Sequence, residues 1–254
     1  MSRSKGEVSS SYMEECKSKY LPTAVLPWER RRVYIAGGQP GNIGGAIALE
    51  LAGRGVRSVV QSNYSVGADL WLAEFGKFDT LILCNAETWL DWIEDQEDDK
   101  IDSVIDNSLT ESIKATSHFV QATLENIGVR KHIVFIGSMA ANAVLNGSAP
   151  YCAAKAGLQH FAKCVAWELA PKGYDVFCVE PSNTQDTPMT RATIEGLARY
   201  RGISRDEARE YWGAVLPRDE WLQKSDIGEV VADLVSGRWS YASGTNIRLA
   251  GGQR

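Results

Sequence analysis

Short apolar runs alternate with longer amphipathic segments along most of the chain. The first run, RVYIA at residues 32–36, is followed by IGGAIALELAGRG, in which apolar residues recur at helical spacing before a closing glycine. The same alternation repeats toward the carboxyl terminus. Further strands are predicted at Ser58–Gln61, Thr80–Cys84, His132–Ile136, Asp175–Val179 and Asn246–Leu249, and further helices at about residues 67–76, 101–127, 150–171, 190–213 and 226–236.

This alternation of apolar strands with helices predicts a parallel sheet that is covered by helices on both faces. We therefore predict an α/β fold with a doubly wound, Rossmann-like parallel sheet, formed by residues 32–254 as a single domain. Residues 1–31 are polar, contain two prolines and show no sustained periodicity. They are predicted to form an N-terminal extension that packs through Tyr20, Leu21 and Trp28.

Composition and charge narrow the classes of function. The chain of 254 residues has a net charge of −5 and no basic tract, which argues against nucleic acid or an anionic membrane surface as a partner. No apolar run approaches the roughly 18 residues of a membrane span, and residues 1–31 lack the apolar core of a signal peptide. The acidic run EDQEDD at residues 94–99 is interpreted as a solvated loop or a helix start.

The cysteines indicate a reducing compartment. They are odd in number, scattered, and form neither a CxxC motif nor a Cys/His cluster, so neither a disulfide framework nor a metal site is expected. We interpret them as reduced, buried thiols and expect the protein in the cytoplasm. The five cysteines are Cys16, Cys84, Cys152, Cys164 and Cys178.

A glycine-rich segment, AGGQPGNIGGAIA at residues 36–48, lies where the first predicted strand turns into the first predicted helix. Glycines let the backbone turn tightly and approach a pyrophosphate closely, and the N-terminus of the following helix favours the negative charge. Many strand-to-helix turns need glycine for geometry alone. The position after the first strand of an alternating chain nevertheless favours a nucleotide site.

Tyr151 and Lys155 are four residues apart in the helix predicted at 150–171. Such a pair is common on ordinary amphipathic helices and by itself indicates no chemistry. A phenol and an ammonium on one helical face can also act as a proton-transfer pair. Ser138 ends the apolar run HIVFIGS thirteen residues before Tyr151.

Together these segments resemble the short-chain dehydrogenase/reductase family from about Arg32 to Arg254. The glycine segment is similar to the family's TGxxxGIG loop, with Gly37 in place of the Thr and Asn42, a residue tolerant of left-handed backbone, in place of the middle Gly. LILCNAE resembles the NAG motif, with Glu87 replacing its Gly, and Ser138 precedes the YxxxK motif at the family's spacing. VEPSNTQDTPMT resembles the segment PG…T-x-M, with Ser182 in the place of the Gly.

The resemblance implies a role for each matching residue. Tyr151 would exchange a proton with the substrate oxygen, Lys155 would lower the pKa of Tyr151 and bind the cofactor ribose, and Ser138 would orient the substrate. A helix position that supports the lysine through water falls on Ser112 by spacing, with Asn107 as the alternative. The residues implied in cofactor binding are Gly38, Asn42, Ile43, Gly44, Ser62, Asn63, Asn85, Ala86, Tyr151, Lys155 and Thr187.

The sequence departs from the family in the half of the site that would bind adenosine. The place of the acid that bonds a ribose 2′-hydroxyl falls on Ser62, followed by Asn63, so NADP(H) is slightly preferred over NAD(H). Only 23 positions separate Ser62 from Asn85, too few for the usual third strand and its helices. We therefore expect the sheet to lack that edge strand, and Arg31 and Arg32 from the extension are candidates to complete the site.

Two hypotheses follow. The first is an NAD(P)(H)-dependent oxidoreductase that acts on a carbonyl or alcohol substrate with a Ser-Tyr-Lys site. The alternative is a protein of the same fold with non-redox catalysis or a binding role and a degenerate cofactor site. Halohydrin dehalogenases, which resemble the family, are a precedent for the alternative, but they carry Arg where this chain has Lys155.

A variable substrate lid is expected at about residues 188–222. It contains Tyr200, Tyr211, Trp212 and Trp221, which are expected to pack the lid onto the core while its arginines face water, although an aromatic, cationic cover over an acidic or ring-containing substrate is an alternative. Trp89 and Trp92 are further candidates for the border of the cleft. The resemblance also implies a homodimer or homotetramer formed through the helices at 101–127 and 150–171, where Phe161 and Trp167 suit an interface or the core equally.

Overall fold

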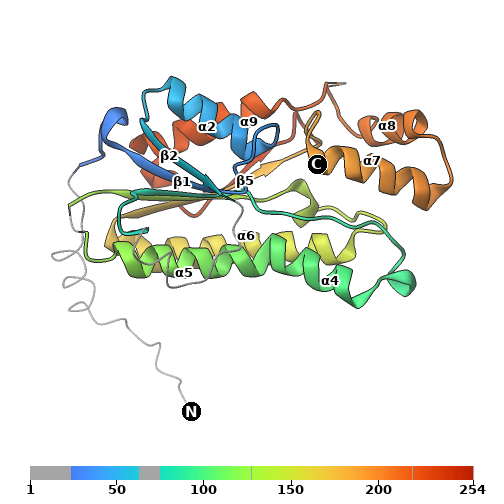
Figure 1. The fold of residues 1–254 in the computed structure, drawn as a ribbon, viewed down its shortest axis with the longest axis horizontal. Helices are drawn as coiled ribbons and strands as arrows, with labels where there is room; N and C mark the ends of the chain where they lie inside the picture. Colours follow the sequence, from blue (N-terminus) through green and yellow to red (C-terminus); the bar gives the residue numbers. More distant parts are fainter. Residues whose placement is uncertain (1–23, 63–74, 127, 219, 254) are drawn as a thin grey trace, which may run out of the picture.

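A single parallel sheet of six strands organises the part of the chain that the structure, a computed structural model, describes: residues 24–253 without 63–74, 127 and 219 (Figure 1). Its strand order is β2-β1-β3-β4-β5-β6, and every neighbouring pair is parallel. The strands are β1 (Arg32–Ala36), β2 (Ser58–Ser62), β3 (Thr80–Leu83), β4 (Lys131–Ile136), β5 (Tyr174–Pro181) and β6 (Asn246–Leu249). The predicted doubly wound α/β fold is confirmed.

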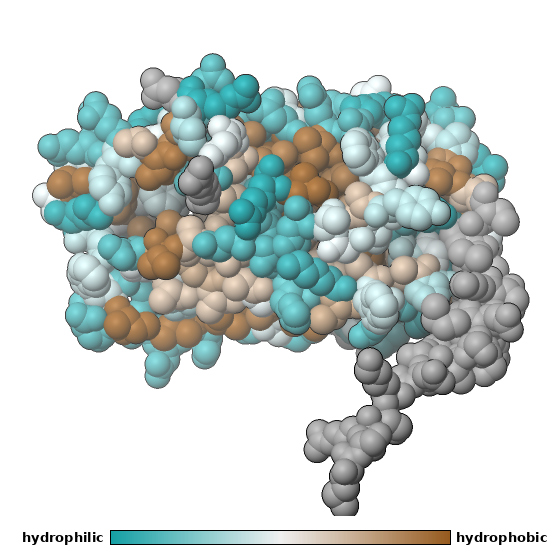
Figure 2. Space-filling view, turned by 180° about the vertical axis from the view of Figure 1, so that it is seen from behind, coloured by the Kyte–Doolittle hydropathy of each residue, from teal (hydrophilic) through white to brown (hydrophobic). Residues whose placement is uncertain are grey.

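Helices cover both faces of the sheet (Figure 1). One layer holds α2 (Ile43–Gly53) and α9 (Lys224–Asp233), and the other holds α4 (Asp98–Ile105), α5 (Glu111–Thr123) and α6 (Ala149–Leu169). Two more helices, α7 (Pro188–Arg201) and α8 (Arg205–Gly213), lie to one side, beyond the end of the sheet. Seen from behind, apolar residues gather between hydrophilic ones on the lower part of the surface (Figure 2).

Two apolar clusters, one on each face, hold these layers together. Tyr34, Phe75 and Phe119 lie in the cluster beneath α5 and α6, where their rings meet edge to face at centroid distances of 5.1 Å and 5.9 Å. Ile47 and Ile227, both fully buried, belong to the cluster beneath α2 and α9. Because the inner strands β1, β3, β4 and β5 are buried on both faces, their sequences read as nearly continuous apolar runs.

The third edge strand, which the sequence was predicted to lack, does not occur among the described residues, in which β2 is the edge next to β1. The helix predicted at 67–76 falls almost wholly outside the described residues. The long helix predicted at 101–127 begins earlier, at Asp98 within the acidic run, and ends at Thr123, with a π-helical turn at Asp106–Thr110. The single helix predicted at 190–213 is wrong: Gly202, with a φ of 66°, ends α7, and Ser204 starts α8 with a capping box.

Trp28 and two arginines lie at the amino-terminal edge of the sheet. Trp28 packs against the cluster beneath α2 and α9, and the Arg31 guanidinium lies 4.6 Å from the Trp28 ring centroid. Arg31 is buried and donates to the carbonyls of Leu26 and Val235, while the Arg32 N–H donates to Asp79. The expectation that these arginines complete a cofactor site is wrong, because Arg31 precedes β1 and Arg32 begins it, whereas the glycine loop follows the other end of the strand. Tyr20 and Leu21 lie outside the described residues.

Buried charged and polar groups continue along this amino-terminal edge. His132 is 1% exposed, and neither of its ring nitrogens has a hydrogen-bond partner among the described residues. Its Nε2 lies 3.7 Å from Asp175, whose carboxylate is bonded by Arg130 and Ser240. Burial, and then the charges of Arg31 and Arg130, lower the pKa of His132 well below its usual value, so the ring is neutral despite the nearby carboxylate.

The buried ring of His132 makes the stability of the fold sensitive to acid. The unfolded chain protonates this histidine near pH 6.5 and the folded chain does not, so the free energy of unfolding falls as the pH drops below that value, by up to about 1.4 kcal/mol per pH unit. In urea unfolding between about pH 7.5 and 5.5, we expect His132→Gln to remove this loss and exposed His160→Gln to keep it. An unchanged pH dependence in His132→Gln would contradict the assignment.

The described cysteines are free thiols, and not all of them are buried. Cys178 is buried and Cys84 and Cys152 are half-buried, but Cys164 is exposed on α6, which corrects the expectation of uniformly buried thiols. Cys16 lies outside the described residues. No helix of the described part is both long enough and apolar enough to span a membrane.

Candidate functional site

A cavity of about 420 Å³ opens at the carboxyl-terminal edge of the sheet. Parallel strands bring the segments that follow them to this edge, where open α/β sheets bind their ligands. The cavity is lined by the start of α2, the segments after β3, β4 and β5, the first turns of α6, and the lid helices. Of the predicted site residues it gathers Asn42, Ile43, Gly44, Ala86, Ser138, Tyr151, Lys155 and Thr187.

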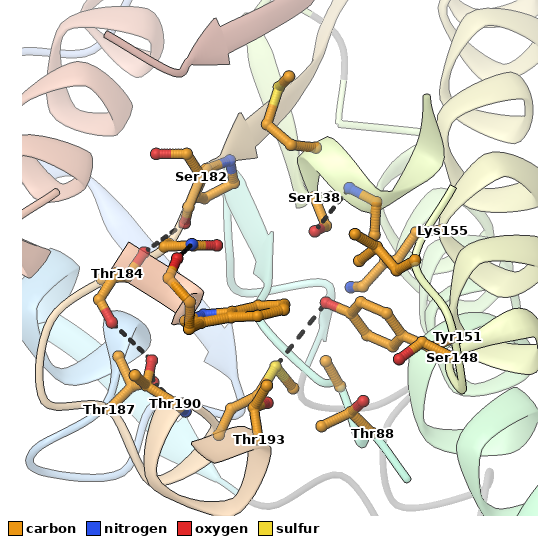
Figure 3. Close-up of a pocket in the computed structure, with 18 of the residues that line it drawn as sticks. Thr88, Ser138, Ser148, Tyr151, Lys155, Ser182, Thr184, Thr187, Thr190 and Thr193 are labelled. Carbon is orange, nitrogen blue, oxygen red and sulfur yellow. Dashed lines mark hydrogen bonds between the residues drawn. The ribbon is translucent and has the colours of Figure 1, made fainter. Parts of the chain in front are cut away.

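Ser138, Tyr151 and Lys155 lie together on one wall of this cavity, opposite Thr184, Thr187 and Thr190 (Figure 3). Tyr151 and Lys155 come from successive turns of α6, and the ammonium nitrogen lies 5.8 Å from the phenol ring centroid. Ser138 Oγ accepts a hydrogen bond from the Ala140 N–H, which leaves its own proton available for donation into the cavity.

Burial dominates the electrostatics of this wall. Burial raises the pKa of Tyr151 to about 12, and a hydrogen bond from Ser138 offsets part of this rise. Burial lowers the pKa of Lys155 to about 8, and the nearby thiols of Cys178 and Cys84 offset part of this fall. At neutral pH the phenol is therefore protonated and the amine is charged, the states required to donate a proton and to stabilise the phenolate that remains.

Lys155 is fixed through the strand that leads to Ser138. Its Nζ donates to the Ile136 carbonyl at 2.9 Å, and the side chain is 1% exposed. An ammonium has three donors, and the other two have no partner among the described residues. They are available for a ribose hydroxyl or a water in the cavity.

The two candidates for the supporting helix position differ in surroundings, and neither hydrogen-bonds Lys155. Asn107 lies in the π-helical turn and donates to the Glu87 carboxylate at 2.8 Å, so Glu87, which replaces the motif glycine, holds this turn. Ser112 is buried in α5, and its Oγ has no hydrogen-bond partner among the described residues. The assignment of Ser112 stays a prediction.

The glycine loop folds tightly onto itself. Gly37 and Gly41 have φ values of 75° and 86°, whereas Asn42 is extended at −101°, which corrects the expected left-handed Asn. The Asn42 side chain caps α2 instead: its Oδ1 accepts the Gly45 N–H and its Nδ2 donates to the Gly37 carbonyl. A Cβ on Gly44 would lie 2.7 Å from the Gly37 oxygen, so this turn excludes a side chain.

The loop leaves donors for an anion. The N–H groups of Ile43 and Gly44, at the start of α2, make no hydrogen bond to the described residues, and both residues line the cavity. Free N–H groups at a helix N-terminus are a ready site for phosphate. The tight glycine turn and these two donors fit the diphosphate of a dinucleotide.

The remaining predicted cofactor residues lie around the loop. Asn85 packs against Gly37, where its Oδ1 would lie 2.7 Å from an added Cβ, and Gly38 packs against Gly44 at the same distance. Ser62 ends β2 beside Ala36, the last residue before the loop. Asn63 lies outside the described residues.

Across the cavity, Thr187 begins the lid. Its hydroxyl caps α7 by accepting the Thr190 N–H, and Thr190 in turn donates to the Thr184 carbonyl at 2.5 Å. The far end of the lid returns to the same place, since the Leu222 N–H donates to Asn183 and the Gln185 N–H donates to Leu222. A short backbone stem therefore closes the lid at its base.

The lid aromatics mostly pack, as expected. Trp212, Trp221 and Tyr200 lie against the apolar cluster between the lid and Leu90, while Tyr211 is 47% exposed beneath the Arg201 guanidinium. Of the two tryptophans proposed for the border of the cleft, Trp92 contacts Tyr200 in a tilted arrangement with the ring centroids 4.7 Å apart, and Trp89 packs in the cluster that contains Tyr151.

Sequence reasoning missed some of the lining. Met189, quoted only as a motif position, places its Sδ 3.7 Å from the Tyr151 hydroxyl (Figure 3). Gln253 reaches the cavity from the carboxyl terminus, and no pattern in the sequence indicated it. Trp212 also lines the cavity besides packing the lid.

Comparison with known proteins decides the family. The sequence pattern of the family described as Enoyl-(Acyl carrier protein) reductase matches residues 62–254. The chain belongs to the short-chain dehydrogenase/reductase family. The fold, the enzyme class and the recognition drawn from the motifs are thereby confirmed, and the protein is an NAD(P)-dependent oxidoreductase of this family.

Relatives within the short-chain dehydrogenase/reductase family include 3-oxoacyl-(acyl-carrier-protein) reductases FabG. The chain is 30% identical to that of Salmonella typhimurium over 180 residues, covering 71% of this chain and 68% of the relative. It is 26% identical to that of Rickettsia bellii over 240 residues, covering 85% and 93%.

Solved structures share the fold. An actinorhodin polyketide ketoreductase with NADPH has a TM-score of 0.77 at 22% identity, over 89% of this chain and 98% of that one. Sorbitol-6-phosphate 2-dehydrogenase from Erwinia amylovora has a TM-score of 0.78 at 21% identity, over 88% and 99%.

Proposed function

We propose that the protein transfers a hydride between NADP(H) or NAD(H) and a carbonyl or alcohol substrate, with Ser138, Tyr151 and Lys155 as its catalytic residues. The observation that carries the proposal is the wall formed by these three side chains in a cavity that also reaches the start of α2. Lys155 in particular supports redox use over the non-redox alternative, because its two remaining donors face no protein partner among the described residues.

In the reducing direction, the cofactor would supply the hydride to the carbonyl carbon. The Tyr151 hydroxyl would give its proton to the carbonyl oxygen, and Ser138 would donate a second hydrogen bond to the same oxygen. The Lys155 charge would stabilise the phenolate left behind, and solvent would return the proton to it. Oxidation of the alcohol would run through the same groups in reverse.

The cofactor would lie between the glycine loop and the Thr187 segment. Ile43 and Gly44 would donate to its diphosphate, and Thr187 with the backbone of residues 182–184 would bind the nicotinamide end. The slight preference for NADP(H) rests on the sequence at Ser62 and Asn63, where no acid is present to hold a free ribose 2′-hydroxyl.

The substrate end of the cavity is largely apolar. Leu145, Met189 and Trp212 contribute to it, so an apolar carbonyl compound suits it, and Arg201, which also lines the cavity, supplies a cation for an acidic group on the substrate. Since relatives are named 3-oxoacyl-(acyl-carrier-protein) reductases, a 3-oxoacyl thioester is the first substrate to test.

Titration of the purified protein with NADPH and NADH tests the proposed function. We expect saturable binding in the micromolar range, followed by fluorescence or calorimetry, tighter for NADPH, and oxidation of NADPH when a 3-oxoacyl thioester or a simple ketone is added. Absence of saturation by either cofactor at millimolar concentration would contradict hydride transfer and favour the non-redox alternative.

A homo-oligomer is proposed from family membership, with α5 and α6 as the interface. Trp167 on α6 is 85% exposed and Ile113 on α5 is 37% exposed, which suits such a contact. Phe161, in contrast, is partly buried and packs against the core cluster, with its ring centroid 5.8 Å from that of Phe135.

A further inference from the structure

Lys224, the first residue of α9, connects the glycine loop to the segment just before Thr187. Its Nζ donates to the Gly41 carbonyl in the glycine loop at 3.0 Å and to the Asp186 carbonyl just before Thr187 at 3.3 Å. These two carbonyls belong to the segments between which the dinucleotide would lie. Among the described residues, the ammonium is therefore held between these two segments by backbone carbonyls, beside the cavity rather than among the residues that line it.

The charge of Lys224 is not neutralised by a neighbouring carboxylate. Among the described residues it forms no ion pair, although two acids are near: the Asp186 side chain pairs with Arg209 at 4.0 Å, and the Asp226 side chain accepts the Gln223 N–H. An ammonium has three donors, of which the two carbonyls use two. One donor and the full charge remain for an anion.

Helix geometry places further positive potential at the same point. Helices α2 and α9 pack side by side in the same direction, since Gly228 lies against Ala46 near their starts and Arg54 pairs with Asp233 near their ends. Lys224 touches the residues just before α2 and α7 and itself begins α9, so the N-termini of three helices meet there. Asp186 is also the one described non-glycine residue with positive φ, at 51°.

We propose that Lys224 is a cofactor-binding residue that supplies the cation for the dinucleotide's diphosphate. The inference rests on the proposed function. It extends that function to a residue outside the glycine loop, the YxxxK motif and the Thr187 segment. The charge at Lys224 offsets the changes in the adenosine half of the site, where Asn42 takes one helix N–H and the third edge strand is absent from the described residues.

The test compares variants that separate charge from bridging. Lys224→Gln keeps an N–H donor for the carbonyls but removes the charge, Lys224→Arg keeps the charge, and Lys172→Gln removes a lysine that precedes β5 at the opposite edge of the sheet. Equilibrium binding of NADPH is measured by fluorescence or calorimetry, and thermal unfolding confirms that each variant is folded. A dihydronicotinamide without phosphate, 1-benzyl-1,4-dihydronicotinamide, serves as a hydride donor that cannot use the proposed contact.

We expect Lys224→Gln to weaken NADPH binding about tenfold or more at low salt, Lys224→Arg to remain within about threefold of wild type, and Lys172→Gln to be unchanged. High salt should reduce the difference in NADPH affinity between wild type and Lys224→Gln, because it screens the attraction between the Lys224 charge and the diphosphate in wild type. Turnover with the phosphate-free donor should be equal in wild type and Lys224→Gln.

The outcomes distinguish this inference from the proposed function. If wild type binds NADPH and Lys224→Gln binds it equally well, Lys224 has no part in binding while hydride transfer stands. Equal losses with NADPH and with the phosphate-free donor would show a structural role and would also overturn the inference. If wild type binds neither NADPH nor NADH, both proposals fail together.

Discussion

Tyr151→Phe should lower turnover by about a thousandfold or more while leaving the affinity for NADPH within about twofold of wild type. The substitution removes only the hydroxyl, which lies in the cavity beside Met189 and Ser138, and the ring remains packed against Val104 and Ala140. The proton donor is lost, whereas the glycine loop and Thr187 are unchanged. Single-turnover kinetics with NADPH and a 3-oxoacyl thioester, together with a binding titration, measure the two quantities separately.

A matched control is Tyr174→Phe. Tyr174 is buried at the start of β5, and its hydroxyl is paired with Thr123 at 2.8 Å, far along the strand from the cavity. Its loss should reduce the free energy of unfolding by about 1 kcal/mol and leave the rate unchanged. Wild-type turnover in Tyr151→Phe would remove Tyr151 from the mechanism.

Lys155→Met should abolish most turnover and at the same time change how stability depends on pH. Burial lowers the pKa of Lys155 from 10.5 to about 8, so between these values the unfolded chain binds more protons than the folded chain. The free energy of unfolding of wild type therefore rises with pH in this window, by about 2 to 3 kcal/mol between about pH 7 and pH 10. The variant has no amine to titrate and lacks this rise.

Urea unfolding of wild type and Lys155→Met across this pH range measures the effect as a difference, which cancels the titration of other groups common to both chains. A difference that stays constant with pH would show that Lys155 is not buried as an amine. The same comparison measures how much the buried charge lowers the free energy of unfolding. Below about pH 8 the Lys155 ammonium is charged and desolvated, and among the described residues it has the Ile136 carbonyl as its hydrogen-bond partner.

The sheet could be predicted from the sequence because its inner strands are buried on both faces. Val33, Ile35 and Ile82 therefore lie in short continuous apolar runs, the pattern typical of strands in a parallel sheet. Local chemistry that depends on one side chain was harder to foresee. The break at Gly202 interrupts a pattern whose apolar spacing continues into α8, and periodicity alone does not register a left-handed residue. The extended, capping conformation of Asn42 likewise depends on the Gly37 carbonyl five residues away.

The candidate site followed the same rule. Tyr151, Lys155 and Ser138 were predicted from spacing because fixed strand and helix geometry brings such positions to one edge of the sheet. Contacts between residues that are distant in the sequence have no characteristic spacing and could not be predicted in this way. Lys224 lies two residues after the predicted lid, and no sequence motif marks it. Gln253 lines the cavity because of where the last described residues lie in the fold, which the sequence pattern does not show.

The backbone stem at the base of the lid bears on how this protein could acquire new substrates. Because Asn183 and Gln185 bond to Leu222, the chain leaves and re-enters the fold at nearly the same point. Beyond the turn that holds Thr187 and Met189, the described residues of 191–221 are joined to the rest of the fold through this stem and through packing on Leu90. They can therefore vary in sequence while β6 and the wall formed by Ser138, Tyr151 and Lys155 keep their own contacts. Substitutions in this part of the lid can therefore change substrate specificity while Ser138, Tyr151 and Lys155, and with them the proposed reaction, stay the same.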